Sequence, residues 1–394
     1  MKLRVPYYYD EFHCIAGECK DNCCVGGWEI DIDEDTYHYY QNLEGELGER
    51  IRESITKTDE YCFKLNNGNC PFLLENGLCE IHSKLGEEHL GVVCSQFPRF
   101  SEYYGEIKET GIGLACEEAE RIIFSSDKHF TVVEKDCEEE PVEDSEYDES
   151  FAQKIFKARD CVFKILERDD MSIHERLIVL LSMANDMQEC INSDDFEDID
   201  RVITMYRREQ PEIVLQNLCE EFDDGSFSEI SSVKDEIRKI LYIYEDMEVL
   251  SPEWDDAIKD LITNVHEGMS DDDYNIFNEE FLRSQVGREY EYRNLLEYFV
   301  YRYYAKSIYD YNVLGKIQMI VSNFLVIKEF DILRWFKNHK RFSFQDRIDT
   351  VHVFSRQVEY SEDNIEIMYD GFLFDDVFTC DNLMKLLWID SATS

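Results

Sequence analysis

Cysteines are concentrated at the N-terminal end of this chain of 394 residues. Nine of the fourteen fall within the first 116 residues, and the other five are scattered singly. The densest stretch, Cys14–Cys24, carries four thiols within eleven residues. Short segments that each deliver one or two thiols are typical of loops that converge on a metal ion or cluster. We therefore expect the first third of the chain to fold as an irregular, cysteine-rich domain around its thiols.

Two tight turns are predicted just ahead of further cysteines. The segment Asn66–Asn69 precedes Cys70, and Glu75–Gly77 precedes Cys79. A turn places backbone amides near the sulfur, and these amides stabilise an anionic thiolate. With two later cysteines, the candidate metal ligands are Cys14, Cys19, Cys23, Cys24, Cys70, Cys79, Cys94 and Cys116.

The spacing of these cysteines leaves the identity of the metal open. Structural zinc is usually bound by closely spaced pairs such as C-x2-C, and no such pair occurs here. Adjacent Cys23 and Cys24 are awkward ligands for one ion, because their side chains diverge. Eight thiols suffice for two four-thiolate sites, or for one iron–sulfur cluster with structural cysteines beside it. We favour an iron–sulfur cluster, and zinc stays the alternative.

The surroundings of the thiols are expected to be reducing. The first ten residues lack the apolar core of a signal peptide. The longest apolar region, about 317–327, is interrupted by polar side chains and is too short to span a bilayer. We therefore expect a cytoplasmic protein, in which clustered thiols bind metal more often than they form disulfides.

The charge of the chain restricts its partners. Forty basic and 87 acidic side chains give a net charge of −47. This balance argues against nucleic acid, which needs a basic surface, and against anionic membranes. It favours a cationic partner such as a lysine-bearing protein. A solvated acidic surface that only keeps the protein in solution is the other interpretation.

The rest of the chain is predicted to be helical. Residues 134–149 hold ten acidic side chains in sixteen and favour a linker. We therefore expect three parts: a cysteine-rich metal- or cluster-binding domain over 1–125, an acidic linker over 126–150 and an α-helical domain over 151–394. The fold class is mainly α. The helical predictions cover Glu34–Ile55, Cys116–Phe124, a capping box at Ser172, a start at Ser251-Pro252, Val233–Tyr244, Asn275–Leu282, Arg293–Tyr309 and Leu314–Phe336, and a short strand is predicted at Trp28–Asp33.

Several segments resemble one known family. In the first third these are Pro6–Phe12, Cys14–Trp28, Cys70–Leu73, Leu85–Leu90 and Cys94–Arg99, and far downstream they are Asn294–Tyr303 and Ser355–Asn364. The whole chain is similar to the flagellin lysine-N-methylase family. The resemblance implies transfer of methyl groups from S-adenosyl-L-methionine to lysine side chains of flagellin, with an iron–sulfur cluster of the 4Fe–4S type in the enzyme.

No catalytic residue can be chosen from the sequence. No phosphate-binding loop, nucleophile elbow or H-E-x-x-H motif occurs, and the C-x3-C-x2-C loop of radical S-adenosylmethionine enzymes is absent because position 26 is Gly. Methyl transfer to lysine needs a carboxylate or tyrosine to take up the proton, and aromatic faces to stabilise a cation. The candidates are Tyr7, Tyr8, Tyr9, Tyr37, Tyr103, Tyr104, Asp31, Asp33 and Glu106. A non-enzymatic metal carrier and an electron-transfer protein are the alternatives.

Overall fold

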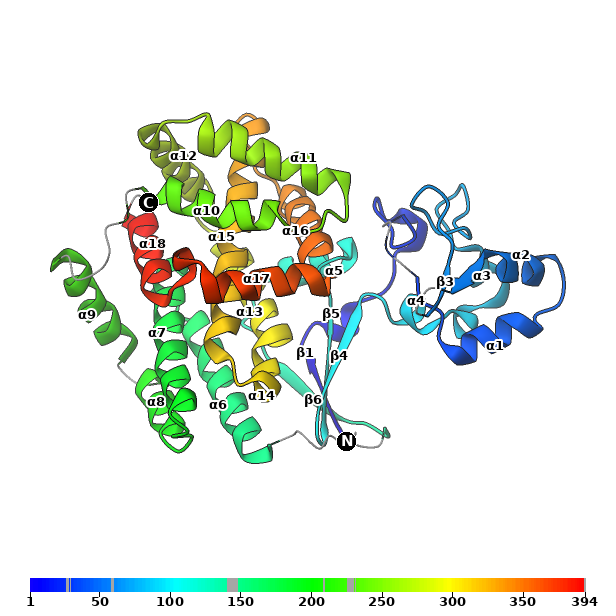
Figure 1. Cartoon of the computed structure of the whole chain (residues 1–394), viewed down its shortest axis with the longest axis horizontal. Helices are drawn as coiled ribbons and strands as arrows, with labels where there is room; N and C mark the ends of the chain where they lie inside the picture. Colours follow the sequence, from blue (N-terminus) through cyan, green and yellow to red (C-terminus); the bar gives the residue numbers. More distant parts are fainter. Residues whose placement is uncertain are drawn as a thin grey trace.

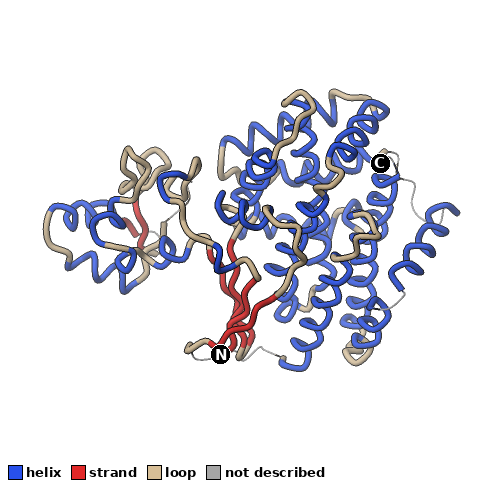
Figure 2. Tube along the Cα trace, turned by 180° about the vertical axis from the view of Figure 1, so that it is seen from behind, coloured by secondary structure: helices blue, strands red, loops and turns tan. Residues whose placement is uncertain are grey.

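The computed structural model describes residues 1–25, 28, 30–57, 60–139, 148–207, 210–224, 230 and 232–392. Most of these residues are helical, so the predicted mainly α fold is confirmed. Figures 1 and 2 show a large group of helices, a short sheet at its edge and a smaller lobe beyond the sheet. We call residues 13–98 the cysteine lobe, and residues 1–12 with 99–392 the helical body.

The helical body is packed around α15 (Val313–Lys337). This helix is almost completely buried, as expected for the central helix of a large core, and buried charged side chains such as Lys328, Glu329 and Asp331 lie among its apolar ones. The side chain of Asn312 caps its start by accepting the N–H of Gly315 at 2.9 Å. The other body helices are α5 (Glu117–Phe124), α6 (Glu149–Leu166), α7 (Ile173–Asn192), α8 (Ile199–Arg207), α9 (Gln210–Asp224), α10 (Val233–Glu245), α11 (Pro252–Leu261), α12 (Asp271–Ser284), α13 (Glu289–Tyr303), α14 (Ser307–Asp310), α16 (Phe344–Val358), α17 (Glu362–Phe374) and α18 (Cys380–Ala392).

A four-stranded sheet lies between these helices and the lobe. Its order is β4-β5-β1-β6, from β4 (Arg99–Tyr104), β5 (Ile107–Ile112), β1 (Lys2–Pro6) and β6 (Val132–Asp136). The β4–β5 hairpin turns at Gly105, whose φ of 59° suits glycine. Strand β1 runs parallel to β5, with Lys2 opposite Ile107, and antiparallel to β6. The start of the chain is thus held inside the sheet by two strands that come about a hundred residues later.

The sheet is fixed to the body by polar contacts as well as by apolar packing. Glu109 of β5 and Arg159 of α6 form a bidentate ion pair at 2.5 and 2.6 Å, with both side chains buried. The hydroxyl of Tyr301 on α13 donates to the carbonyl of Arg4 at 2.8 Å. These contacts hold β1 and β5 against the helices from which the body is built.

The cysteine lobe has its own small core. It contains α1 (Glu34–Asn42), α2 (Glu46–Ser54), β2 (Ile55–Lys57), β3 (Tyr61–Phe63), α3 (Glu80–Leu85) and α4 (Val92–Gln96). Its buried side chains are Ile30, Ile32, Tyr40, Ile51, Phe63, Cys70, Phe72 and Ile81. The domain boundaries predicted at 125/126 and 150/151 stay predictions, but the packing places β1, β4, β5 and α5 with the body core.

Several local predictions for the N-terminal third differ from the structure. The helix predicted over Glu34–Ile55 is two helices, because the chain leaves α1 at Leu43 and turns at Gly45, where φ is 89°. The described part of the strand predicted at Trp28–Asp33 makes only an isolated bridge, between Asp31 and Cys62; residue 29 lies outside the described residues. The helix predicted over Cys116–Phe124 is confirmed as α5.

The predictions for the helical body are mostly confirmed. The capping box of α7 is present at Ser172, and Ser251 caps α11 with proline in its first turn. The predicted helix Arg293–Tyr309 is interrupted by a 3-10 turn, Tyr304–Lys306, between α13 and α14. Within the segment predicted as an acidic linker, residues 132–136 form β6, and residues 140–147 lie outside the described residues. In the described part of the chain no helix is both long and apolar enough to cross a membrane.

Candidate metal centre and the junction between lobe and body

Five of the eight predicted metal ligands gather in the cysteine lobe. The thiol of Cys24 interacts with the sulfurs of Cys23 and Cys70. Cys94 interacts electrostatically with Cys70, Cys23 and Cys79. The backbone also joins two of these loops, because the N–H of Cys70 donates to the carbonyl of Cys24 at 2.8 Å. We call these five residues the lobe thiol group.

The backbone around these sulfurs supplies hydrogen-bond donors, and each cysteine follows a turn predicted from the sequence. The turn ahead of Cys70 has positive φ at Asn67 and Gly68, and the turn ahead of Cys79 has it at Gly77. Cys79 caps α3, and its sulfur lies 3.5 Å from the donating N–H nitrogen of His82. Both predicted turns are present, but the backbone donors to the sulfurs come from residues after each cysteine, Phe72 for Cys70 and Ile81 with His82 for Cys79. Such donors stabilise thiolates.

Two further candidate ligands meet where the lobe touches the body. The thiol of Cys19 lies 3.7 Å from Oε2 of Glu117 and interacts electrostatically with Cys116, the N-cap of α5. Burial, and next the charge of Glu117, raise the pKa of Cys19 to about 12. Cys14 is exposed, and its sulfur accepts the N–H of Ala16 at 3.4 Å. The eight predicted ligands thus fall into a group of five, a pair and a single surface thiol.

The donor chemistry of the lobe thiol group fits a soft metal centre. Its donors are sulfurs, and sulfur donors with backbone N–H partners select zinc or iron–sulfur clusters. Hydrogen bonding with Cys24 lowers the pKa of Cys23 to about 7, so one thiol is easily deprotonated. Among the described residues, however, no three or more His, Cys, Asp or Glu side chains are arranged around a common point that could hold an ion. Instead, Cys24 hydrogen-bonds to Cys23 and Cys70, and Cys79 and Cys94 interact with the group electrostatically.

A charged cluster joins the cysteine lobe to α16. The imidazole of His352 lies between two carboxylates, with Nδ1 3.3 Å from Glu120 and Nε2 3.2 Å from Asp21. Arg356, one turn further along, pairs with the same Asp21. Although burial opposes it, the charges of Glu120 and Asp21 raise the pKa of His352 to about 9. Because Asp21 lies between Cys19 and Cys23, these contacts fix the densest cysteine stretch to the body.

Trp28 adds an aromatic contact to the same junction. Its indole Nε1–H donates to the carbonyl of Cys23 at 2.9 Å. Its ring lies near those of Phe97 and Tyr360, with centroids 5.6 and 5.7 Å away. The guanidinium of Arg356 lies over the indole, 4.5 Å from its centroid, which is a cation–π geometry. The junction therefore combines buried charge with tilted, closely packed aromatic rings.

Behind these rings, Glu359 is a buried acceptor for several hydroxyls. Its Oε2 accepts the hydroxyls of Tyr298 and Tyr303 at 2.9 and 2.7 Å, and its Oε1 accepts Ser355 at 2.7 Å. Arg302 lies 3.4 Å from the same carboxylate. With its oxygens occupied, Glu359 positions its neighbours. The segments Asn294–Tyr303 and Ser355–Asn364, which carry the family resemblance, therefore meet here beside Cys14–Trp28.

Three of the nine catalytic candidates drawn from the sequence, Asp33, Tyr37 and Tyr104, lie at structural positions. Asp33 caps α1 by accepting the N–H of Thr36 at 2.9 Å, and Tyr37 stacks on Tyr61. Tyr104 is buried and stacked on Tyr309. Sequence reasoning missed His352, Arg302, Arg356 and Glu359. These residues lie on, or at the end of, helices whose other side chains are apolar enough to be buried. Because charged side chains are rarely buried without a partner, their presence on such helices is the signal that could have found them.

The fold and site define a mainly helical protein with a thiol-rich lobe inserted into it. The family model described as the FliB lysine N-methylase C-terminal domain matches residues 159–386, which is more than half of the chain. The chain therefore belongs to this lysine N-methylase family.

Three curated relatives support the same assignment. Lysine-N-methylases of Salmonella typhimurium (strain LT2) and Salmonella choleraesuis (strain SC-B67) are each 29% identical over 142 residues, 33% of this chain and 34% of the relative. The flagellar biosynthetic protein FliU of Salmonella muenchen is 29% identical over 142 residues, 33% of this chain and 81% of that protein. The chain thus spans about a third of the length of the two lysine-N-methylases it matches. No solved structure matches it significantly.

Proposed function

We propose that this chain transfers methyl groups from S-adenosyl-L-methionine to lysine side chains of flagellin. The observation that carries the proposal is the match of residues 159–386 to the lysine N-methylase family. The names of the curated relatives, lysine-N-methylase and flagellar biosynthetic protein, support the reaction and the flagellar substrate. A cytoplasmic location goes with the proposal, because reduced thiols persist there.

The eight cysteines remain the candidate ligands of an iron–sulfur cluster, which takes four thiolates, and the lobe thiol group is their proposed source. The all-sulfur donor set, the easily deprotonated Cys23 and the backbone N–H groups beside Cys70 and Cys79 support this assignment. A bound 4Fe–4S cluster would supply a centre whose potential depends on those hydrogen bonds. Zinc on the same thiols is the alternative, and it would supply a structural centre.

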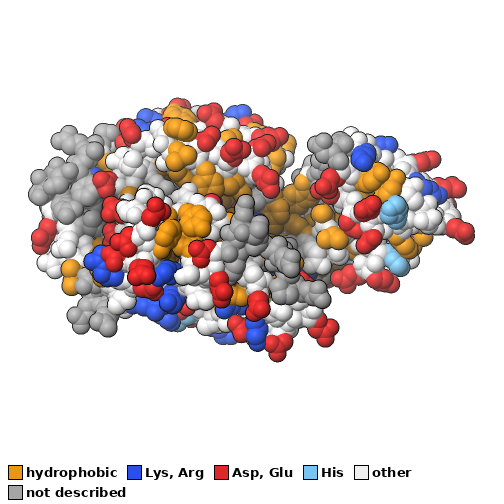
Figure 3. Space-filling model, turned by 60° about the horizontal axis from the view of Figure 1, so that its bottom comes forward, with side chains coloured by type: hydrophobic (Ala, Val, Ile, Leu, Met, Phe, Trp, Pro, Cys, Tyr) orange, Lys and Arg blue, Asp and Glu red, His pale blue; other side chains and the backbone are white. Residues whose placement is uncertain are grey.

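The reaction requires an uncharged amine. The lysine ammonium, with a pKa of about 10.4, first loses a proton. The nitrogen lone pair then attacks the methyl carbon of the sulfonium, the carbon–sulfur bond breaks, and its electron pair stays on sulfur. The products are methyl-lysine, S-adenosylhomocysteine and one proton. The net charge of −47 would attract lysine-rich surfaces and raise their local concentration. Figure 3 shows acidic side chains spread over one face of both the lobe and the body.

The proposal is tested with purified flagellin. The chain is purified without oxygen, its iron and zinc are measured, and it is incubated with flagellin and S-adenosylmethionine. Mass spectrometry of the flagellin should show methyl-mass increments on lysine-containing peptides. Heat-inactivated protein is the control for non-enzymatic methylation. Flagellin of unchanged mass, with the metal centre intact, would contradict the proposed activity.

An exposed thiol favours a second candidate function, delivery of a metal or cluster to another protein. Cys14 is exposed, and a thiol on the surface can exchange ligands with a partner. This function predicts transfer of iron or zinc to an acceptor apoprotein, and no binding of S-adenosylmethionine. Equilibrium dialysis with labelled S-adenosylmethionine distinguishes the two candidates.

A further inference from the structure

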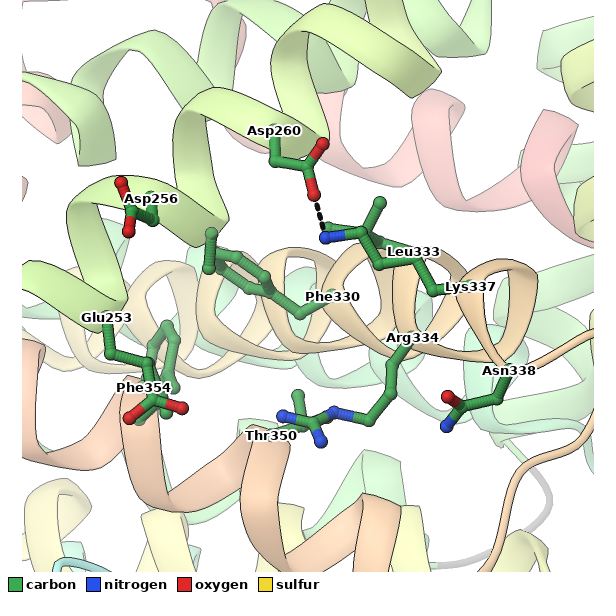
Figure 4. A pocket seen from close by; sticks show the side chains of 12 residues that line it. Glu253, Asp256, Asp260, Phe330, Leu333, Arg334, Lys337, Asn338, Thr350 and Phe354 are labelled. Carbon is green, nitrogen blue, oxygen red and sulfur yellow. Dashed lines mark ion pairs between the residues drawn. The ribbon is translucent and has the colours of Figure 1, made fainter.

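A groove on the helical body lies away from the thiols. It is formed by α11, the C-terminal half of α15 and the middle of α16, and its volume is about 840 Å³. Cavities of this size suit small molecules and cofactors. Figure 4 shows the groove, with Glu253 and Asp260 on the α11 side and the guanidinium of Arg334 on the other side. The ring of Phe330 lies between these two sides.

The floor of the groove is aromatic. Phe330 and Phe354 line it, and both pack against the buried indole of Trp254, with centroids 5.3 and 6.2 Å away. Trp254 and Phe354 are completely buried, so the floor is held rigidly by the core. An aromatic floor of this kind favours a flat ring system, because stacked rings gain more than their buried area alone.

The two walls carry opposite charges. Glu253, Asp256 and Asp260 follow one another at three- and four-residue intervals, which places them on one face of α11. Asp260 pairs with Lys337 on the opposite wall. Lys259 pairs instead with Asp255, at 2.6 Å. Within the described residues, Glu253 and Asp256 therefore face the groove without an ion-pair partner.

A buried hydroxyl also points to a ligand. Thr350 lines the groove and is only 4% exposed, and its Oγ1 makes no hydrogen bond of normal geometry to any described residue, since its interaction with the Asp331 carboxyl is a loose one. Buried hydroxyls are rarely left unsatisfied, since an unmade hydrogen bond costs about 1–3 kcal/mol. A polar ligand atom in the groove would satisfy it.

We propose that this groove binds S-adenosylmethionine, the methyl donor of the proposed function on which this inference rests. The purine would lie on Phe330, whose ring keeps some exposed surface, with Phe354 supporting the floor from beneath. The sulfonium and the ammonium would lie toward Glu253 and Asp256. The carboxylate of the amino-acid tail would lie toward Arg334, whose guanidinium is 3.2 Å from Asp349. The groove opens to solvent, so a substrate lysine can approach the methyl group from outside.

The position of the groove relates the donor to the metal centre. Helix α16 contributes Thr350 and Phe354 to the groove, and His352 and Arg356 to the junction with the cysteine lobe. At 3.6 residues per turn these pairs lie on different faces of one helix. The donor site and the lobe thiol group are thus separated by α16, and the thiols do not line the donor site.

The test compares a charged and a neutral ligand. Calorimetry on the full-length, anaerobically purified protein measures the Kd of S-adenosylmethionine and of S-adenosylhomocysteine, which lacks the sulfonium charge. The double variant Glu253→Gln/Asp256→Asn should weaken S-adenosylmethionine about tenfold or more, and S-adenosylhomocysteine distinctly less. Thr350→Val, which keeps the side-chain shape, should weaken both ligands about equally.

A matched control removes the same charge elsewhere. Glu189→Gln/Asp195→Asn alters a second, smaller groove beside α7 and α8, and should leave both affinities unchanged. If the wild type binds the donor and the Glu253/Asp256 variant binds it equally well, the groove assignment is overturned while the proposed methylase function stands. If the wild type binds neither ligand and leaves flagellin unmethylated, both proposals fail. Unaltered melting temperatures confirm that each variant is folded.

Discussion

The imidazole Nε2 of His352 lies 3.2 Å from Oδ2 of Asp21, although 331 residues separate the two in the chain. This contact joins α16 to the loop that carries Cys19 and Cys23. Arg356 pairs with the same carboxylate, so one aspartate anchors the densest cysteine stretch to the helical body. The arrangement makes the attachment of the lobe dependent on a small number of charges, and its contributions can be measured separately.

Replacing Asp21 should loosen the cysteine loop without unfolding the body. In Asp21→Asn, His352 and Arg356 lose their shared anion, and because the Asp21 side chain is 37% exposed we expect a cost of about 1–2 kcal/mol. Hydrogen–deuterium exchange followed by mass spectrometry should show faster exchange in peptides covering residues 14–25, and unchanged exchange in α15. Asp10→Asn, which breaks the exposed pair with Lys135, is the control and should alter neither region.

The junction should weaken at alkaline pH. The pKa of His352 is raised to about 9, so its imidazolium stabilises the folded state fully below its unfolded pKa of about 6.5. That stabilisation is lost as the pH rises through about 9. The difference in free energy of unfolding between wild type and His352→Gln should shrink by on the order of 1–3 kcal/mol between pH 6 and pH 10. Urea titrations at the two values measure it. A difference independent of pH would show that the histidine acts only by packing.

The ion pair between Glu109 and Arg159 should be costly to break on one side only. Arg159→Met leaves a buried, unpaired carboxylate and should lower the free energy of unfolding by about 3–5 kcal/mol. The double variant Glu109→Leu/Arg159→Met should regain most of that loss, because apolar replacements remove both desolvated charges. Chemical denaturation of the single and double variants checks this. Lys2→Ala, which removes an exposed pair with Asp136, should change stability by less than about 1 kcal/mol.

Metal content should depend on the lobe thiol group and not on cysteines elsewhere. Cys70→Ser removes a buried thiol at the centre of the group, and we expect the protein to lose most of its iron or zinc. Cys380→Ser is the matched control, since that thiol donates to the carbonyl of Leu181 in the helical body. Elemental analysis of anaerobically purified protein measures both. Equal metal content in the two variants would place the centre elsewhere.

Removing the metal with a chelator should unfold the lobe before the body. The lobe core is small, whereas the body is built around a long buried helix. Metal binding would therefore supply much of the free energy of folding of the lobe. Chelation should give a separate, lower melting transition in calorimetry, and reconstitution should restore one transition. The Cys70→Ser variant without chelator should show the same early transition.

The helices were predictable because their signals are local. The cap at Ser172, the proline after Ser251 and the apolar run of α15 each lie within one helix, and each is found where the sequence placed it. The break between α1 and α2 was missed, because Gly45 gives only a weak signal within a helical pattern. The resemblance to lysine N-methylases was also readable in the sequence, and the family match confirms it.

The junction was not predictable from one sequence. The contact of Asp21 with His352 and Arg356 forms only because the fold brings distant segments together. The spacing of residues along the sequence gives no sign of such a contact. Gly113 shows the same limit. In the sequence it has no assignable meaning, but in the structure a Cβ at this position would clash with the hydroxyl of Tyr360. The number of cysteines in the first 116 residues predicted that thiols would gather there. It did not predict that they divide into a group of five and a pair.

The cysteine lobe leaves the sheet after β1 and returns to it at β4, so both of its ends are held by strands of the same sheet. The lobe is therefore an insertion between two strands of the sheet of the helical body. Evolution or a protein engineer could exchange it without rerouting the helices. A body in which a short linker replaces the lobe would show directly how much of the chemistry belongs to each half.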